Sequence, residues 1–430
     1  EAAKFKIIVI SVFEKSIAVT KVTLLTFFII LFQCSTLKYY FGITKASPVR
    51  FRTLVAVCQV SVCKLQSKFM NCTRRVWYIS RVTLRNYFKN IRNMKYVTLS
   101  QTEDVMPTLG LGTWQAAPEV IESTVYKALD LGYRHIDTAF NYNNEEAIGN
   151  AIKKWIADGK GTRKDLFITT KLPHVGNRAS DVLKFLDLQL SRLQMSYVDL
   201  YLIHVPFAFQ CDPETLTPVV NKDTGDYELD LETNHITTWK KMEECQKKGL
   251  TRNLGLSNFN ESQMTKIIKA ATLKPQVLQV ELHAYFQQLE LRKFCAENDI
   301  VVTAYAPLGS PGAKTHFVTK YNYSPDAFPD LLCLKEVQDI ADKYGKTTAQ
   351  VLLHFLVQQK VVVIPKSTSE TRLKENMDIY DFEMSPPEIN RLKKLDKGED
   401  GRIFNFLFWK GVEKHPEYPF KLAATEFTKE

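Results

Sequence analysis

The 430-residue sequence lacks the paired patterns that usually hold a metal ion. It has eight cysteines but no CxxC pair and no HExxH motif, so no metal site is expected. Unpaired cysteines in a chain of this size are typical of a reducing compartment, and we therefore expect a cytoplasmic protein. From residue 211 onward the cysteines are scattered, at Cys211, Cys245, Cys295 and Cys333.

Acidic residues are almost absent from the first part of the chain. Residues 1–93 contain 16 Lys or Arg and only 2 acidic residues, a net charge of +14 (16 − 2). The whole chain carries +10, so residues 94–430 carry −4 (10 − 14). The basic charge therefore belongs to the N-terminal segment. It does not indicate a nucleic-acid surface on the rest of the chain, and no nucleic-acid partner is expected.

A long hydrophobic run is also missing. The longest, Val22–Phe32, is interrupted by Thr23 and Thr26 and is shorter than the roughly 20 residues that span a membrane. It matches the apolar region of a secretory signal. Three interpretations of residues 1–93 compete: a non-native extension, a targeting or anchor segment, and a folded domain. We expect a basic segment outside the fold, with membrane contact only if it belongs to the working protein.

From Met94 onward, short β-rich runs alternate with helical stretches after a hairpin-like start. The runs are mostly apolar, as expected of strands covered on both faces. Eight strand–helix units predict an α/β fold of the (β/α)8 TIM-barrel type over 94–430, with long substrate loops at the C-terminal face of the strands. A doubly wound sheet is the rival, but GxGxxG is absent and 110–115 lacks the third glycine. Predicted strands are 109–112, 133–137, 166–170, 198–203, 253–257, 277–281, 300–304 and 361–364; predicted helices are 119–131, 144–158, 179–194, 236–249, 260–272, 287–298, 332–358 and 369–377.

Ionisable residues end three neighbouring predicted strands. Asp137, Lys171 and His204 close the runs, and Tyr142 follows just after the first. Barrel enzymes carry their chemistry at this end of the strands. An ion pair, a core histidine and a packing tyrosine would each be an ordinary structural feature, but the four together favour a site.

A free tyrosine has a pKa of about 10 and is a poor acid near neutrality. The ammonium of Lys171, held by Asp137, favours the phenolate and should make Tyr142 a better proton donor. His204 could orient the same carbonyl oxygen. A hydride must come from a cofactor, because no side chain supplies one. This chemistry is suited to the reduction of a carbonyl group.

Six ordered segments carry a resemblance to a known family: 106–114, 131–152, 168–173, 197–204, 255–260 and 364–376. They resemble the signature segments of the aldo-keto reductase superfamily, and the similarity covers about 94 to 425. The resemblance implies a (β/α)8 barrel that binds NADPH without a Rossmann motif. It also implies that Tyr142 is the general acid, completed by Asp137, Lys171 and His204.

The resemblance assigns the cofactor contacts as well. Ser257, Asn258 and Gln279 match the residues that bond the nicotinamide carboxamide, and Tyr305 matches the ring that stacks under it. The family residues that bind the 2′-phosphate of NADPH are matched here by Lys366, Ser367 and Arg372. A phosphate does prefer a guanidinium and an ammonium as partners. An ordinary solvated charge pair is the alternative for Lys366 and Arg372. Further expected contacts are Glu375 and Asn376 with the adenine, and Thr113, Leu308, Ser310 and Ser369.

The chain also departs from the family pattern. Val205 stands where many members have a tryptophan, so a wider substrate pocket is expected, and Ala306 replaces a common serine. The loop 205–235 is long, and long loops at this face usually form the binding site. His174 and His283 are interpreted as structural or rim residues. Candidate pocket walls are Trp114, Val205 and Phe207, with Phe140 and the segment 402–411.

We therefore expect NADPH-dependent reduction of an aldehyde or ketone to an alcohol. The partner is a small carbonyl compound, no metal is needed, and nothing in the sequence requires an oligomer, so a monomer is expected. Two alternatives remain: a ketosteroid or ecdysteroid reductase, and a non-catalytic binding protein on the same fold.

Overall fold

The computed structural model describes residues 95–421. The expectations for residues 1–93 lie outside this range, and so does the end of the predicted domain beyond residue 421. Within the described range, no helix is both long enough and apolar enough to cross a membrane.

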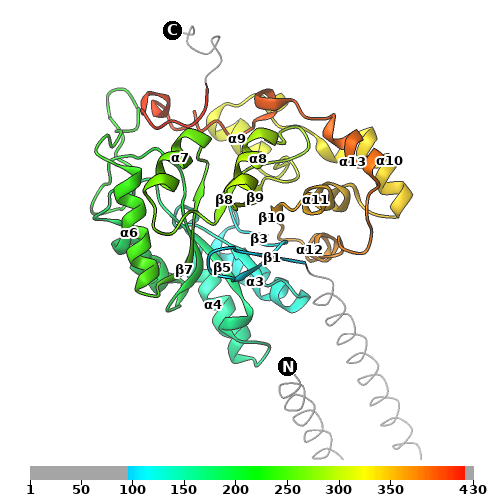
Figure 1. Cartoon of the computed structure of the whole chain (residues 1–430), viewed down its shortest axis with the longest axis horizontal. Helices are drawn as coiled ribbons and strands as arrows, with labels where there is room; N and C mark the ends of the chain where they lie inside the picture. Colours follow the sequence, from blue (N-terminus) through cyan, green and yellow to red (C-terminus); the bar gives the residue numbers. More distant parts are fainter. Residues whose placement is uncertain (1–94, 422–430) are drawn as a thin grey trace, which may run out of the picture. The chain divides into compact units, whose positions relative to one another are not determined.

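Eight parallel strands form one sheet whose spatial order follows the chain. The sheet closes on itself, because Leu109 pairs with Val363 and Gly112 with Lys366 in parallel bridges. This closure confirms the barrel over the doubly wound alternative (Figure 1). All eight predicted strands are present, as β3 (Leu111–Gly112), β4 (His135–Asp137), β5 (Phe167–Leu172), β6 (Val198–Ile203), β7 (Thr251–Ser257), β8 (Val277–Glu281), β9 (Val301–Tyr305) and β10 (Val362–Val363).

The barrel interior is apolar at one end. An antiparallel hairpin, β1 (Tyr96–Thr98) and β2 (Val105–Pro107), lies at the N-terminal end of the strands and contributes Leu99 and Met106. These two side chains pack with an interior layer of strand residues, so this end is closed to solvent. The layer consists of Phe167, Leu200, Leu202, Val277 and Val362.

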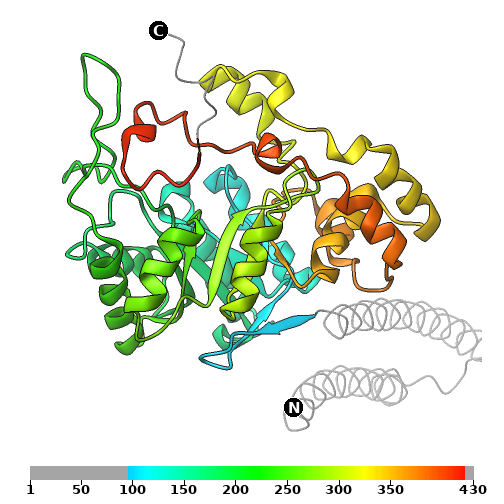
Figure 2. The same cartoon turned by 45° about the horizontal axis from the view of Figure 1, so that its top comes forward.

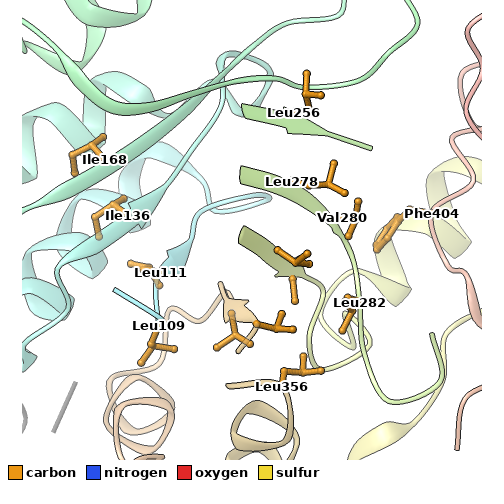
Figure 3. Packing of buried hydrophobic residues seen from close by; sticks show 14 of the residues in the cluster. Leu109, Leu111, Ile136, Ile168, Leu256, Leu278, Val280, Leu282, Leu356 and Phe404 are labelled. Atoms are coloured by element: carbon orange, nitrogen blue, oxygen red, sulfur yellow. The ribbon is translucent and has the colours of Figure 1, made fainter. Parts of the chain in front are cut away.

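Helices surround the barrel (Figure 1) because the outward-facing strand residues are apolar and must be covered. Figure 3 shows part of this cluster, with Ile136 and Ile168 from adjacent strands. The helices are α3 (Pro118–Leu131), α4 (Glu145–Ala157), α5 (Val182–Leu193), α6 (His235–Lys247), α7 (Glu261–Ala270), α8 (Leu289–Glu297), α9 (Lys314–Tyr321), α10 (Lys335–Tyr344), α11 (Thr348–Gln358), α12 (Glu370–Met377) and α13 (Pro386–Lys393). Short 3-10 turns are η1 (Phe140–Tyr142), η2 (Arg163–Asp165), η3 (Pro325–Ala327), η4 (Leu331–Cys333), η5 (Gly398–Gly401) and η6 (Val412–Lys414).

The helical predictions were wrong in three places. The expected helix 332–358 is broken at Gly345, whose φ of 61° ends α10 in a left-handed cap before Thr347 starts α11. Helices α9 and α13 were not predicted. In α9 only Phe317 is buried, so the sequence has no apolar stripe to indicate a helix.

Two long segments cover the C-terminal end of the strands. The loop 205–235 folds back on itself through the bridges Phe209–Leu229, Cys211–Pro218 and Val220–Tyr227. The C-terminal segment from residue 402 crosses the same end (red in Figure 2), opposite the β1–β2 hairpin. His415 joins the two, because its Nε2 contacts the Ala208 N–H and the Asp230 carbonyl.

Candidate active site

Strand alternation places the expected ionisable side chains inside the barrel. Side chains i and i+2 of a strand share a face, so on β5 Phe167, Thr169 and Lys171 all point inward. Phe167 lies in the apolar interior layer. Lys171 is the second inward-facing residue after Phe167 on β5, and it therefore lies nearer the C-terminal end of the strand. Asp137 on β4 pairs with Thr169 on β5. The register therefore brings the Asp137 carboxylate within reach of the lysine.

Lys171 and Asp137 form a buried ion pair. Lys171 Nζ lies 2.6 Å from Asp137 Oδ1, and the side chains are only 0% and 2% exposed. Lys171 Nζ also donates to the Thr138 carbonyl at 2.9 Å, and Gln279 Nε2 donates to Asp137 Oδ2 at 2.7 Å. Burial lowers the pKa of Lys171, but Asp137 and Tyr142 outweigh it and the net pKa is raised. The lysine therefore stays charged inside the barrel.

Tyr142 reaches this pair from the turn η1. Its hydroxyl lies 3.3 Å from Lys171 Nζ. The turn is fixed by Asn144, whose side chain accepts from Thr138 Oγ1 and donates to the Thr113 and Ala116 carbonyls. Burial raises the pKa of Tyr142 above its ordinary value of 10.0, against the Lys171 ammonium, which lowers it. The net direction is opposite to the sequence-based expectation, because desolvation of the phenolate outweighs the lysine.

His204 faces Tyr142 from the end of β6. Its N–H donates to the Leu172 carbonyl at 3.2 Å, which fixes the backbone beside β5. The His204 and Tyr142 rings meet nearly edge to face, with centroids 5.7 Å apart. Burial lowers the pKa of His204 well below 6.5, with further lowering by Lys171 and His174. The imidazole is therefore neutral near pH 7 and keeps one donor and one acceptor nitrogen. The structure thus brings all four residues of the predicted tetrad together.

The residues expected to hold the nicotinamide lie on β7, directly after it, and on β8 and β9. Ser257 pairs with Gln279 across the β7–β8 register. Asn258 Nδ2 donates to the His204 carbonyl and to Ser257 Oγ, while the Tyr305 hydroxyl donates to Asn258 Oδ1. Asn258 thus uses both amide hydrogens internally and braces the site. Within residues 95–421, the Ser257 hydroxyl hydrogen, Gln279 Oε1 and one hydrogen of Gln279 Nε2 make no hydrogen bond, so these polar atoms are available to a carboxamide.

The residues expected at the phosphate end lie between β10 and α12. Ser369 caps α12 by accepting from the Arg372 N–H, and Ser367 is buried beside it. Within residues 95–421, neither Lys366 nor Arg372 pairs with a carboxylate, whereas Lys374 on the same helix pairs with Glu370 at 2.7 Å. Burial lowers the pKa of Lys366. Two unpaired cations at a helix start are suited to a phosphate.

The remaining cofactor candidates are dispersed around this region. The buried hydroxyl of Thr113 donates to the Asp137 carbonyl at 2.9 Å and so braces the ion pair. Leu308 and Ser310 lie in the loop after β9 and are partly buried. Asn376 is buried and Glu375 is partly buried on α12.

Aromatic side chains line the expected substrate side. Trp114 meets Phe404 of the C-terminal segment edge on, with centroids 5.6 Å apart, and Tyr305 lies 6.0 Å from the same ring. Phe404 shares its apolar cluster with the β8 residue Val280 (Figure 3). Val205 is 2% exposed. Phe207 is 0% exposed and packs on Trp409, so, like Val205, it has almost no exposed surface.

Glu281 is a buried carboxylate that the sequence reasoning missed. It ends β8, and its oxygens accept from the Ile403 N–H at 2.7 Å and the Phe404 N–H at 2.9 Å. His283 Nε2 lies 3.0 Å from Oε1 of the same group. Glu281 therefore fixes the segment that carries Phe404. Its position two residues after Gln279, on the same strand face, was the available signal.

No cluster of three metal-ligating side chains occurs in the part of the chain that the structure describes. A cavity of about 310 Å³ lies between the start of α5 and the loop 205–235. It is lined by Val175, Arg178, Asp181, Lys184, Phe185, Gln210, Cys211, Pro213 and Asp230, none of which belongs to the tetrad.

Comparisons with known proteins agree with this geometry. Residues 108–397 match the model of the aldo/keto reductase family. A Xenopus tropicalis protein named aldo-keto reductase family 1 member A1 is 42% identical over 332 residues, which cover 76% of this chain and 98% of that protein. The Homo sapiens protein of the same name is 41% identical over 300 residues, covering 70% and 89%. The structure of an aldose reductase from Schistosoma japonicum superposes with a TM-score of 0.68 at 36% identity, covering 76% and 99%. The chain belongs to the aldo/keto reductase family and is an oxidoreductase that acts on carbonyl groups.

Proposed function

We propose that this protein reduces aldehydes or ketones to alcohols with NADPH, and that Tyr142 donates the proton. The proposal rests on two successive contacts of the Lys171 ammonium. Lys171 Nζ lies 2.6 Å from Asp137 Oδ1 and 3.3 Å from the Tyr142 hydroxyl, and the His204 ring faces the same phenol. When bound, NADPH supplies the hydride. The protein's own residues then have to bind the carbonyl compound, orient it and deliver a proton.

The raised pKa keeps Tyr142 protonated near neutrality, so the hydroxyl holds the proton it must give. The Lys171 ammonium stabilises the phenolate that remains after transfer, and Asp137 keeps that ammonium in place. The neutral His204 offers a hydrogen bond to the same carbonyl oxygen. This arrangement favours the charge distribution of the transition state over that of the bound substrate.

The cofactor proposal rests on the phosphate end of the barrel. Lys366 and Arg372 have no carboxylate partner among the described residues, and they flank the buried Ser367 at the start of α12. A 2′-phosphate would give both cations a counter-charge, whereas NADH has no such group. We therefore propose a clear preference for NADPH over NADH.

The test is NADPH consumption by the purified protein against a panel of aldehydes, sugars and ketosteroids. Turnover of any panel member is the expected result, and the preferred compound identifies the substrate class. Preference for ketosteroids would favour the steroid-reductase alternative, in keeping with Val205 where many members of the family have a tryptophan. Tight NADPH binding without turnover across the panel would favour the non-catalytic alternative.

Two further proposals concern the setting of this activity. The described cysteines Cys211, Cys245, Cys295 and Cys333 are all unpaired, which supports a reducing, cytoplasmic location. The tetrad is built from one chain, which supports activity as a monomer. Sedimentation of the active protein tests the second proposal.

A further inference from the structure

Glu145 is a buried carboxylate that the mechanism above does not use. It is the first residue of α4, three positions after Tyr142, and it is 2% exposed. Its Oε1 accepts from Thr170 Oγ1 at 2.6 Å and from Gln189 Nε2 at 2.9 Å. The carboxylate therefore joins the start of α4 to the strand β5 and to the helix α5.

These contacts lie behind the tetrad, on the outer side of β5. Side chains alternate along a strand, so Thr170 faces outward where Lys171 faces the barrel interior. Gln189 Nε2 also donates to the Lys171 carbonyl at 3.1 Å, and Gln189 Oε1 accepts from the Tyr201 hydroxyl at 2.9 Å. The backbone that carries the Lys171 ammonium is thus held from outside by the network that ends at Glu145.

Two links therefore join the same pair of segments. Inside the barrel, Lys171 Nζ lies 3.3 Å from the Tyr142 hydroxyl, and outside it Thr170 donates to Glu145. Both links run from adjacent residues of β5 to the segment formed by η1 and the start of α4. The side-chain hydrogen bonds of Asn144 tie this segment to residues that follow β3 and β4, so Glu145 adds the link to β5.

Arg192 of α5 holds the other end of the turn η1. Its guanidinium lies over the Phe140 ring, 4.5 Å from the centroid, and its Nη1 is 3.9 Å from Glu145 Oε2. Among the described residues, this carboxylate oxygen has no hydrogen-bond partner. Burial raises the pKa of Glu145, although its hydrogen bonds and the Arg192 guanidinium oppose the rise. A carboxylate is therefore a costly residue for packing alone at this position, which indicates a role in positioning.

We propose that Glu145 is a positioning residue, which sets the distance between the Tyr142 hydroxyl and the Lys171 ammonium by fixing the start of α4 against β5. The inference rests on the proposed function, because that distance matters only if Tyr142 delivers a proton. Glu145 lies outside the barrel and acts through these two residues. Its loss should slow the chemical step and leave cofactor binding at the start of α12 unchanged.

The test measures single turnovers, in which the protein, in excess over NADPH, is mixed with a saturating aldehyde that the wild type reduces. The loss of NADPH absorbance then reports the chemical step apart from product release. Glu145→Met keeps the length of the side chain but removes the acceptor. Its single-turnover rate is expected to fall about 10- to 100-fold, because a small misplacement of reacting groups has effects of this size. NADPH affinity should stay near wild type.

Glu145→Gln is the conservative variant. Its amide oxygen can replace Oε1 and accept from Thr170 and Gln189, so its rate should stay within about threefold of wild type. Thr170→Val removes one donor from the carboxylate with little change in the shape of the side chain, and it should slow the single turnover at least about threefold. The valine variant decides the question if Glu145→Met does not fold.

Glu243→Met is the matched control. Glu243 on α6 is 5% exposed, and its Oε1 also accepts two hydrogen bonds, from the Thr272 and Leu273 N–H groups. The control variant should lose stability in urea as Glu145→Met does, yet keep the wild-type single-turnover rate. Equal slowing in the two methionine variants would show that lost stability alone causes the effect, and would overturn this inference.

The other outcomes also separate this inference from the proposed function. A wild-type rate in folded Glu145→Met, or in Thr170→Val where that variant decides, overturns this inference alone. A Glu145→Gln rate as low as that of Glu145→Met does the same, because the acceptor is then not what matters. If the wild-type protein reduces no carbonyl compound, the proposed function is overturned and this inference with it.

Discussion

Lys171 and Asp137 are joined by a 2.6 Å ion pair with almost no solvent exposure, on adjacent strands of the barrel. Two unpaired charges in this place would be costly, so each residue requires the other. The pair is held further by the Thr138 carbonyl and the Gln279 amide. This arrangement keeps a positive charge fixed 3.3 Å from the Tyr142 hydroxyl.

Lys171→Met should destabilise the protein by about 3–5 kcal/mol, because it leaves the Asp137 carboxylate buried without a cation. Lys160→Met is the matched control. Its pair with Asp130 is more than a third exposed, so the loss should be at most about 1 kcal/mol. Urea unfolding at neutral pH measures both. Equal losses in the two variants would contradict the described burial of the Lys171–Asp137 pair.

Arg372→Leu should weaken NADPH binding about 10- to 100-fold, because a charge-assisted hydrogen bond to the phosphate is lost. NADH binding should change by less than about twofold, since NADH lacks that phosphate. Lys374→Leu lies on the same helix, and its ammonium is already paired with Glu370, so it should leave both affinities near wild type. Fluorescence titration with each nucleotide distinguishes these outcomes. Parallel loss of both affinities in Arg372→Leu would refute the phosphate assignment.

Stability should fall as the pH is lowered from about 6.5 toward 4. Burial lowers the pKa of His174 to about 3 in the folded protein, so only the unfolded chain takes up this proton in that window. Protonation of the unfolded chain therefore lowers the free energy of unfolding by up to about 1.4 kcal/mol per pH unit for this residue. His174→Phe should make the fall shallower. His316→Gln, at an exposed position on α9, should leave it unchanged. Unfolding curves at several pH values give the slopes, and identical slopes in wild type and His174→Phe would count against a buried neutral ring.

Glu281→Gln should loosen the C-terminal segment. The substitution turns one carboxylate oxygen into an NH2 group, which cannot accept from the Ile403 or Phe404 N–H. A loss of about 2–3 kcal/mol is expected, because a buried donor is left unpaired. Limited proteolysis should then cut beyond residue 402 faster than in wild type. Glu290→Gln, exposed on α8, should have little effect. Unchanged proteolysis in Glu281→Gln would show that other contacts hold the segment.

Sequence patterns were sufficient to predict the barrel and to select four residues that the structure brings together. Each strand is a short apolar run, because both faces are covered, and Asp137, Lys171 and His204 stand out as ionisable residues at the ends of such runs. Tyr142 was found because it follows one of those ends. The helix α13 also had a signal that was overlooked, since Ser385 and Glu388 form a capping box around Pro386.

Other features depend on contacts that no local pattern contains. Glu281 accepts hydrogen bonds from Ile403 and Phe404, which lie more than a hundred residues later in the sequence. The His174 ring contacts Trp409, which is also far away in the sequence. The net rise of the Tyr142 pKa reflects desolvation of the phenol, which the sequence did not reveal. Phe207 was also expected in the substrate pocket, yet it is fully buried and packs against Trp409.

The most direct test of the central claim is the turnover of Tyr142→Phe beside wild type, with NADPH affinity measured in parallel. Tyr142→Phe is expected to lower kcat by about 100- to 10,000-fold, the range expected when a general acid is removed. NADPH affinity should stay near wild type, because Tyr142 contacts Lys171 and His204 rather than the proposed phosphate site. Near wild-type turnover in this variant would contradict the role of Tyr142 as the proton donor.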